Sequence, residues 1–586
     1  MSVPSMIQLR RALRECAIKS SERCLYQTSK WASEMLNALP EQDNTNNAFV
    51  HPSSSLAFQT DAVERNLERK EFNKFIQAKA FFNCHEFHRC AGVFLAANVG
   101  EMDMPLSAGA KQDYHNLSLF IRRGISQKSL FLALHALLMA GEKQKTEELG
   151  QPLGPSDRGD VVNKEMMHIK QVLNTWFKGM DDDPHPRAGD GFLEYLYGMI
   201  LSRELVTDIA KAYLLKSVAR NPWNWGAWLE LGSLIANLQE LHDLRPKLGQ
   251  HIMVAFFYLY CRVKLNDMTT SLETDLTRLQ TVFPQSQFIQ AQRALTLYRK
   301  MDYEAANTLY NGMNISHPRS LDFVDQHSSL LFSMGSRDRS ALLAQYCTAV
   351  DSFRPETCLA VRNYYSLIGR HEDAISSFHK ALNLDRNYGS AWILLGHEYN
   401  HMENTDSAAI CYHRAVQLEP HEFRGLFGLG QCYEALDKPH LALHFYRRAV
   451  RVNNTNVSLW TALADCYIEV NRFDSAIKTL ESALEHIAPY TSGTEGNDKF
   501  TSHLRYKRIE VLKQLAQLYR SDRNRPLAIE TIQRCLDEGS EHLQREDTEN
   551  AMRTNLSDSI IPQAEILLEK WMTTTGNERR SARVSN

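Results

Sequence analysis

One arrangement of small and large apolar residues recurs in this chain at a fixed interval of 34 residues. The stretch that begins at Trp392 places leucine, glycine, tyrosine and alanine in a set order, and the same order returns from Leu426. Further copies begin at Trp460 and, more faintly, at Cys358. Four consecutive copies of this 34-residue pattern are far beyond chance, so the chain is expected to fold as an array of similar units.

The length and residue types of this repeat are typical of the tetratricopeptide repeat (TPR), in which about 34 residues form two helices joined by a turn. Glycine is expected where the two helices of one hairpin cross closely, because a larger side chain would separate them. Aromatic residues are expected to fill the space between hairpins, and Pro420 ends a second helix. The residues predicted to pack the repeats are Trp392, Leu395, Gly396, Tyr399, Ala408, Tyr412, Ala415, Leu426, Gly430, Tyr433, Ala442, Trp460, Tyr467 and Ala476.

The repeat weakens towards both ends but can be followed through most of the chain, so the predicted fold is an all-α TPR superhelical solenoid of stacked hairpins. The hairpin from Val324 to Val350 fits the register only with a slip of about two residues. The predicted parts are an N-terminal helical hairpin (1–36), a flexible polar insertion (37–60), a degenerate repeat region (61–190), partly degenerate middle repeats (191–354), four strong repeats (355–488), a loop (489–501), a last repeat with a capping helix (502–572) and a disordered tail (573–586).

Length and charge restrict the class of protein. The chain has 586 residues, more than one compact core usually supports, and a formal net charge of −3. A nucleic-acid surface would show an excess of lysine and arginine, so we expect no nucleic-acid partner. The longest apolar run, from Met253, is about half of what crosses a bilayer, and the N-terminus lacks the apolar core of a signal peptide. We therefore expect no membrane partner and a location in the nucleus and cytoplasm.

Two short motifs could suggest chemistry, but neither fits its surroundings. The segment from Cys84 to Cys90 holds two cysteines and two histidines, yet the histidines are three residues apart and the segment coincides with the turn of a repeat. The glycine-rich run that ends at Gly430 lies inside a predicted first helix with no strand before it, so it does not indicate a phosphate loop. We predict no metal, no cofactor and no catalytic activity, and we expect the 11 scattered cysteines to be small buried residues.

In a TPR array the first helix of each hairpin lines a concave face. The lining predicted from the repeat spacing is polar to acidic, with Arg424 as the chief exception. Such a groove favours an extended peptide that carries arginine or lysine, because each base can form charge-assisted hydrogen bonds with a carboxylate. The alternative is that these side chains form only a solvated face. The predicted groove residues are Asn363, His397, Glu398, Asn400, Gln431, Glu434 and Asp465.

Several motifs in series resemble one particular family. The runs "NYYSL", "GHEY" and "GLGQCYE", together with "GAWLEL" and "DGFLEYLYGMIL", are similar to the pattern of subunit eight of the anaphase-promoting complex, or cyclosome. The resemblance extends over roughly residues 8–540. The insertion at 37–60 and the loop at 489–501 depart from the family pattern.

The resemblance implies a function. Members of this family are non-catalytic scaffold subunits of a ubiquitin ligase that controls mitotic progression and exit. The resemblance implies a homodimer formed through the N-terminal repeats (61–190), contacts with other TPR and scaffold subunits, and a C-terminal groove for the basic C-box motif of activator subunits. Asn363 and Glu398 match positions that contact that motif, so Glu398→Lys is expected to weaken activator binding without unfolding the chain.

Other classes of protein remain open on the sequence alone. A TPR adaptor of another assembly, such as a chaperone cofactor or an RNA-processing or transport complex, would share the repeats. The acidic groove argues against the chaperone version, because such domains clamp a carboxylate with paired lysine and arginine. An enzyme with an attached repeat domain would need a catalytic segment outside the repeats, and neither 100–190 nor the last 50 residues holds a plausible one.

Overall fold

The computed structural model is helical, and no β-strand occurs among the residues that it describes. The predicted all-α fold is therefore confirmed for this part of the chain. Most of the predicted insertion at 37–60, the centre of the loop at 489–501 and the predicted tail at 573–586 lie outside the described residues. The described residues are 6–40, 58, 60–95, 124–148, 163–181, 189–265, 267, 270–420, 422–491, 499–521, 524–544 and 555–571.

The helices group into two compact units, and the boundary falls between Ile289 and Gln290. The boundaries of the eight predicted parts follow the strength of the repeat pattern instead of contacts, so they remain predictions. Unit 1 contains α1 (Met6–Glu22), α2 (Tyr26–Asn37), α3 (Ala62–Asn83), α4 (Phe87–Gly92), α6 (Gln127–Glu148), α7 (Glu165–Asp181), α8 (Phe192–Arg203), α9 (Thr207–Arg220), α10 (Trp225–Ser233), α11 (Leu238–Leu244), α12 (Ile252–Lys264) and α13 (Thr270–Val282).

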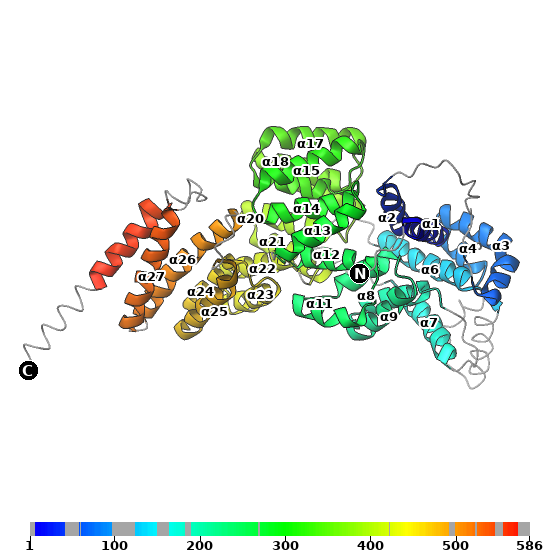
Figure 1. Cartoon of the computed structure of the whole chain (residues 1–586), viewed down its shortest axis with the longest axis horizontal. Helices are drawn as coiled ribbons and strands as arrows, with labels where there is room; N and C mark the ends of the chain where they lie inside the picture. The colour runs from blue at the N-terminus through cyan, green and yellow to red at the C-terminus, as the bar shows by residue number, and fades with distance from the viewer. Residues whose placement is uncertain are drawn as a thin grey trace, which may run out of the picture. The chain divides into compact units, whose positions relative to one another are not determined.

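Unit 2 is a regular succession of helical hairpins (Figure 1). Its first hairpin begins with α14, which spans the boundary between the units. The helices are α14 (Gln287–Arg299), α15 (Tyr303–Ser316), α16 (Val324–Ser333), α17 (Arg337–Val350), α18 (Pro355–Leu367), α19 (His371–Leu384), α20 (Gly389–His401), α21 (Thr405–Leu418), α22 (Phe423–Ala435), α23 (Pro439–Val452), α24 (Val457–Glu469), α25 (Phe473–Thr491), α26 (Lys499–Ser521) and α27 (Arg525–Leu543), followed by a π-helical turn (Leu556–Ile560).

The turns inside the six hairpins from α14 to α25 fix the 34-residue period. One residue in each of these turns has a left-handed backbone, which lets the chain reverse direction after the first helix. The second helix then begins two residues later in each of these six hairpins. These turn residues are Met301 (φ 63), Gly335 (φ 64), Gly369 (φ 78), Glu403 (φ 58), Asp437 (φ 56) and Asn471 (φ 58), each 34 residues after the one before.

The predicted slip in the hairpin from Val324 to Val350 is wrong. Its turn residue, Gly335, keeps the interval, because α16 has 10 residues where α18 has 13, and the link before α16 is correspondingly longer. Positions 34 residues before the packing positions of the next repeat are buried here too, including Ser328 and Ser340. Because polar residues occupy these core positions, the 34-residue repeat cannot be recognised here from the pattern of apolar residues alone.

The predicted packing residues lie inside unit 2. Tyr412 shows how they fit: its ring lies where a Cβ atom on Gly396, in the same hairpin, would come within 2.7 Å of it. A Cβ atom on Gly428, in the next hairpin, would come within 2.6 Å of the same ring. Glycine at both positions therefore lets one tyrosine join two repeats. All the other predicted packing residues are buried as well except Tyr433, which is half-buried.

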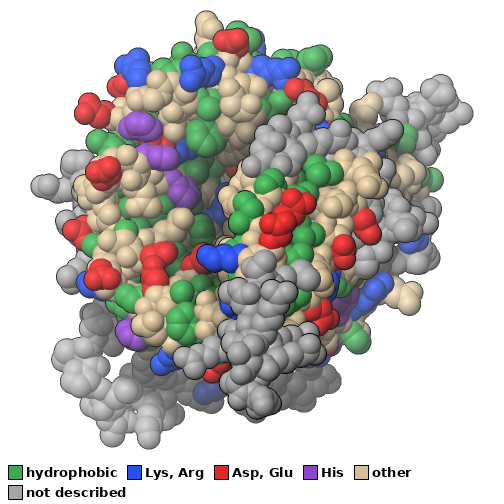
Figure 2. All heavy atoms as spheres, turned by 90° about the vertical axis from the view of Figure 1, so that its left-hand side faces the viewer, with side chains coloured by type: hydrophobic (Ala, Val, Ile, Leu, Met, Phe, Trp, Pro, Cys, Tyr) green, Lys and Arg blue, Asp and Glu red, His purple; other side chains and the backbone are tan. Residues whose placement is uncertain are grey.

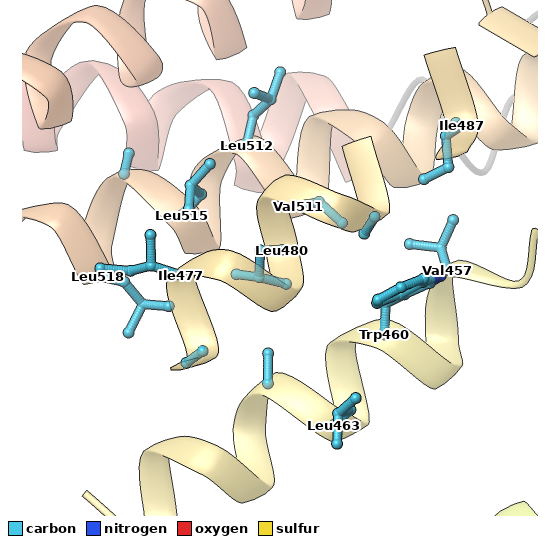
Figure 3. Packing of buried hydrophobic residues seen from close by; sticks show 14 of the residues in the cluster. Val457, Trp460, Leu463, Ile477, Leu480, Ile487, Val511, Leu512, Leu515 and Leu518 are labelled. Atoms are coloured by element: carbon cyan, nitrogen blue, oxygen red, sulfur yellow. The ribbon is translucent and has the colours of Figure 1, made fainter. Parts of the chain in front are cut away.

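The last repeats share one apolar core. Figure 3 shows Trp460 and Leu463 of α24 beside Leu480 of α25 and Leu515 of α26. This core includes helix α26, which begins within the segment predicted as a loop, at Lys499. Burial of this apolar surface, and not helix propensity alone, holds the hairpins together.

Unit 1 contains a contact between distant segments of the chain. The Trp31 ring of α2 stacks on Trp225 of α10, with 5.0 Å between ring centroids. Trp31 also meets the edge of Phe256 in α12, and the Met35 sulfur lies 3.3 Å from the Ser286 hydroxyl. The N-terminal hairpin is therefore packed against helices that lie some 200 residues further along the chain.

Candidate functional site

The predicted groove residues lie on four successive first helices but differ widely in exposure. Asn363 and Glu398 are almost completely buried, at 2% and 1% exposure. His397, Asn400 and Glu434 are half-buried, whereas Gln431 and Asp465 are exposed. Asn363 belongs to α18, His397, Glu398 and Asn400 belong to α20, Gln431 and Glu434 belong to α22, and Asp465 belongs to α24.

Glu398 forms a buried ion pair with Arg362 of α18. The Arg362 Nη2 atom lies 2.6 Å from Glu398 Oε1, and both side chains are at most 2% exposed. Ser366 donates a hydrogen bond to the same carboxylate oxygen at 2.8 Å, and His371 Nδ1 lies 2.7 Å from the other oxygen. Arg362 also lies over the ring of Phe378, 4.6 Å from its centroid. The Glu398 carboxylate is thus fully engaged inside the wall formed by α18, α19 and α20.

Asn363 belongs to the same buried network. Its side-chain oxygen accepts a hydrogen bond from Arg362, and its amide nitrogen donates to the Ser328 hydroxyl of α16 at 2.6 Å. The expectation that Asn363 and Glu398 offer free polar atoms to a peptide therefore needs correction. In this structure both side chains join neighbouring repeats to each other.

The pKa values in this network reflect its burial and its charges. Burial alone would raise the pKa of Glu398, but Arg362 and the hydrogen bonds from His371 and Ser366 outweigh it and hold that pKa below its usual value. Burial lowers the pKa of Arg362, and Glu398 opposes that shift. Because the guanidinium group is a very strong base and the pKa of Glu398 is lowered, both partners are charged at neutral pH.

Arg362 is not among the site residues predicted from the sequence, although one signal for it was present. In the next repeats the matching positions hold Gly396, Gly430 and Ala464, which are small because two helices cross there. The side chain of an arginine at such a position must either point out of the contact between the two helices or be buried beside an acidic partner. An unpaired buried charge would be costly. A basic residue in a column of small residues therefore indicates a buried carboxylate nearby.

His397 and Asn400 contact the hydroxyl group of one tyrosine. His397 Nδ1 lies 2.9 Å from the Tyr412 hydroxyl, and the Asn400 amide nitrogen lies 3.5 Å from it. Burial, with smaller contributions from Arg362 and Arg424, lowers the pKa of His397 to about 4. His397 is therefore neutral near pH 7, so it adds no charge to the surface.

The free energy of unfolding of unit 2 is expected to fall as the pH drops below about 6.5. In the folded chain the pKa of His397 is about 4, below that of an unfolded histidine, so the unfolded state binds the proton first. The stabilisation that neutral His397 gives to the folded state is complete above pH ~6.5 and is lost towards pH ~4. Over this range the free energy of unfolding falls by up to about 1.4 kcal/mol per pH unit. Urea denaturation followed by circular dichroism at several pH values measures this slope. His397→Gln should reduce the slope, and an unchanged slope would contradict the assignment.

Four carboxylates gather on α22, α24 and the turn between α22 and α23. We call Glu434, Asp437, Asp465 and Glu469 the acidic cluster. Tyr446 donates a hydrogen bond to Glu434 at 2.6 Å, while Asp437, Asp465 and Glu469 form no ion pair with any described residue. Burial and the charge of Glu434 raise the pKa of Asp465, and burial with Glu434, Asp465 and Asp437 raises the pKa of Glu469. The carboxylates thus repel one another, and a bound cation would relieve that repulsion.

Elsewhere the predicted groove is not acidic. Arg424 Nε lies 2.8 Å from Glu422 Oε1, and Arg299 of α14 is close enough to Arg424 to be influenced by its charge. Burial, followed by Arg424, lowers the pKa of Arg299 to about 10. Histidine, basic and acidic side chains all occur around the hollow on the face of the molecule shown in Figure 2. Arg299 therefore adds a second basic side chain beside the predicted exception, Arg424, and the carboxylates of the acidic cluster lie on α22, α24 and the turn after α22.

Cys84 is exposed and Cys90 is buried, and no group of three or more histidine, cysteine or acidic side chains among the described residues has an arrangement suited to a metal ion. None of the described helices is both long enough and apolar enough to cross a membrane.

The chain is similar to two known protein families. A family model described as "Anaphase promoting complex subunit 8 / Cdc23" matches residues 8–294, and one described as "Anaphase-promoting complex, cyclosome, subunit 3" matches residues 401–483. The first match covers nearly the same residues as unit 1.

Two curated proteins illustrate the similarity. "Anaphase-promoting complex subunit 8" of Arabidopsis thaliana is 31% identical over 68% of this chain and 66% of that protein. "Anaphase-promoting complex subunit CDC23" of Saccharomyces cerevisiae is 27% identical over 69% of this chain and 70% of that protein. The chain thus matches about two thirds of the length of these relatives. Among solved structures, the chain is similar to one in "Crystal structure of APC/C hetero-tetramer Cut9-Hcn1", with a TM-score of 0.46, 17% identity and coverage of 87% of this chain and 97% of that one.

Proposed function

Because the chain belongs to the family of anaphase-promoting complex subunit 8, we propose that it is a TPR scaffold of that complex without catalytic activity of its own. The proposed partners are the other TPR and scaffold subunits of this ubiquitin ligase, which controls mitotic progression and exit. The proposed location is the nucleus and cytoplasm. Support comes from the family relationship and from a fold that consists of stacked hairpins, whose faces suit the binding of other chains.

The acidic cluster is the proposed site for a basic peptide, the C-box motif of an activator subunit. The observation that carries this proposal is that Asp465 and Glu469 have raised pKa values and no cationic partner among the described residues. A peptide arginine placed between them would form charge-assisted hydrogen bonds and remove the repulsion between the carboxylates. The site proposed here therefore lies on α22 and α24 and not on the buried Asn363 and Glu398.

A titration of the purified chain with a synthetic peptide that carries two arginines tests this site. Binding is expected in the micromolar range, which is about −8 kcal/mol, and it should weaken as salt is added. The control is the same peptide with glutamine in place of arginine, which should bind at least about tenfold more weakly. Equal affinity of the two peptides would argue against recognition by the acidic cluster.

Helix α3 supports the proposal of a homodimer because it exposes two large apolar side chains, although it buries carboxylates together with Phe75, Ala78 and Phe82. It buries the carboxylates of Glu64 and Glu71, while Phe72 and Ile76 are 45% and 53% exposed. The buried carboxylates accept hydrogen bonds from the start of α6. The Ser126 hydroxyl donates to Glu71 at 2.6 Å, and the backbone N–H of Gln127 donates to Glu64 at 3.1 Å. Two large apolar side chains one turn apart then face away from the fold, as in an interface between subunits.

The double substitution Phe72→Glu with Ile76→Glu is expected to weaken the proposed homodimer by about 100-fold or more, because it would bury carboxylates in an apolar contact. Analytical ultracentrifugation across a dilution series measures the dissociation constant. The control is Ile315→Glu in α15, which changes a more exposed isoleucine (80%) in unit 2. A wild-type chain that sediments as a monomer, or a double variant that dimerises normally, would refute the role of α3.

A further inference from the structure

The described part of unit 2 contains a cavity on the side of its second helices. It has a volume of about 480 Å³ and lies between α15 and α17, with α16 beneath them. The positions of α15 and α17 can be followed in Figure 1. Since first helices line the concave face of a TPR array, this cavity is separate from the acidic cluster. Its lining residues are Glu304, Asn307, Thr308, Asn311, Asn314, His327, Leu331, Arg339, Leu342, Leu343 and Tyr346.

One wall of the cavity is a row of three asparagines on α15. Asn307, Asn311 and Asn314 follow one another at helical intervals of four and three residues, so they lie on one face of the helix. The side chains of Asn311 and Asn314 form no hydrogen bond with any described residue. Asn311 is exposed and Asn314 is half-buried, so both amides are accessible to a ligand. A side-chain amide offers such a ligand two donors and an acceptor.

The third asparagine is oriented by a buried histidine. His327 is 4% exposed and stacks on Tyr310, and its Nε2 lies 3.0 Å from the Asn307 side-chain oxygen. Burial lowers the pKa of His327 to about 4, so the ring carries one proton near pH 7. Because the Asn307 oxygen can only accept, that proton is on Nε2. The amide nitrogen of Asn307, which has no partner among the described residues, is then held as a donor at 5% exposure.

The opposite wall is apolar, and the charges at the rim are already paired. Leu331 and Leu343 are buried at the cavity, while Leu342 is 67% exposed at its edge. Arg339 Nη1 lies 3.1 and 3.2 Å from the two carboxylate oxygens of Glu304. The lining therefore offers amide groups and an apolar surface, without a net charge to attract an ion.

We propose that this cavity binds an extended, uncharged peptide segment of a partner protein, with its backbone on the asparagines and an apolar side chain on the leucines. Successive turns of α15 place Asn307 and Asn311 about 6 Å apart, which is close to the ~6.6 Å between alternate residues of an extended chain. Each asparagine amide can pair with a backbone carbonyl or N–H group whatever the sequence of the peptide. The apolar wall, with the exposed Leu342, would then select the side chain that points to the other side.

A library of random-sequence peptides, selected on the purified full chain, tests this proposal. The enriched peptides are expected to be rich in uncharged residues with at least one large apolar side chain. Synthetic copies should bind the double variant Asn311→Ala with Asn314→Ala about tenfold or more weakly than the wild type, because two hydrogen-bonding groups are lost. Leu342→Asp should weaken binding to a similar degree, since it places a charge on the apolar wall.

The matched control is Asn383→Ala, which changes an exposed asparagine of α19 outside the cavity and should leave affinity unchanged. Hydrogen exchange on the wild-type chain gives a second readout: a bound peptide should slow exchange in α15 and α17. The proposal is overturned if no peptide is enriched, or if the enriched peptides bind the cavity variants as well as the wild type. Peptides that lose affinity only when Asp465 and Glu469 are reversed would also count against it, since they bind the acidic cluster.

Discussion

Glu398→Lys is expected to destabilise unit 2 by about 3–5 kcal/mol, because it breaks a buried ion pair and places two cations side by side. Arg362 would keep its burial and lose its carboxylate partner, and the hydrogen bonds from His371 and Ser366 would be lost as well. Urea denaturation followed by circular dichroism measures the change. This expectation replaces the one drawn from the sequence, in which the same substitution weakened binding without unfolding the chain.

Two further variants separate the ion pair from a general effect of charge. Glu372→Lys, at an exposed position of α19, makes the same change in net charge and should alter stability by less than about 0.5 kcal/mol. Arg362→Met combined with Glu398→Met removes both charges and should recover much of the loss, because a buried ion pair can often be replaced by apolar residues. A Glu398→Lys chain as stable as the wild type would show that the carboxylate is not buried in solution.

Asp465→Lys combined with Glu469→Lys is expected to weaken binding of the arginine-containing peptide by about 100-fold. The change replaces two attractive charges with repulsive ones at the site where the carboxylates already repel each other. The fold should be retained, because both side chains are exposed and the new lysines would attract Glu434 and Asp437, which repel the native carboxylates. Fluorescence anisotropy with a labelled peptide measures the affinity.

The control for this charge reversal lies on the second helix of the same hairpin. Asp474→Lys combined with Glu485→Lys makes an identical change in net charge at exposed positions of α25. It should leave the affinity within about threefold of the wild type, since only screened long-range charge is altered. If both double variants weaken binding equally, then the peptide responds to overall charge and the acidic cluster is not its site.

Much of the fold of unit 2 could be predicted from the sequence because the repeat constrains both packing and turns. A glycine such as Gly428 or Gly396 is required where the Tyr412 ring enters, so the spacing of small and aromatic residues indicates which helices cross. The hairpin of α16 and α17 was harder to place, since it fills core positions with polar residues such as Ser328 and Ser340. Its turn glycine, Gly335, was the better guide to the register.

The candidate site could be predicted only in part, because helical spacing gives the direction of a side chain and not its partner. Glu398 was assigned to the groove by spacing, but its burial depends on Arg362, 36 residues earlier in the sequence. The acidity of Asp465 and Glu434 could be read from the sequence. Their grouping with Asp437 and Glu469 depends on the angle between neighbouring hairpins, which no single repeat encodes.

The central claim is that this chain is a scaffold of the anaphase-promoting complex, and affinity purification of the tagged full-length chain from its own cells tests it most directly. Mass spectrometry of the purified material should find the other subunits of that complex in comparable amounts, and the Glu372→Lys control should recover the same set. If the chain is recovered alone, or with the subunits of a different assembly, the claim is contradicted.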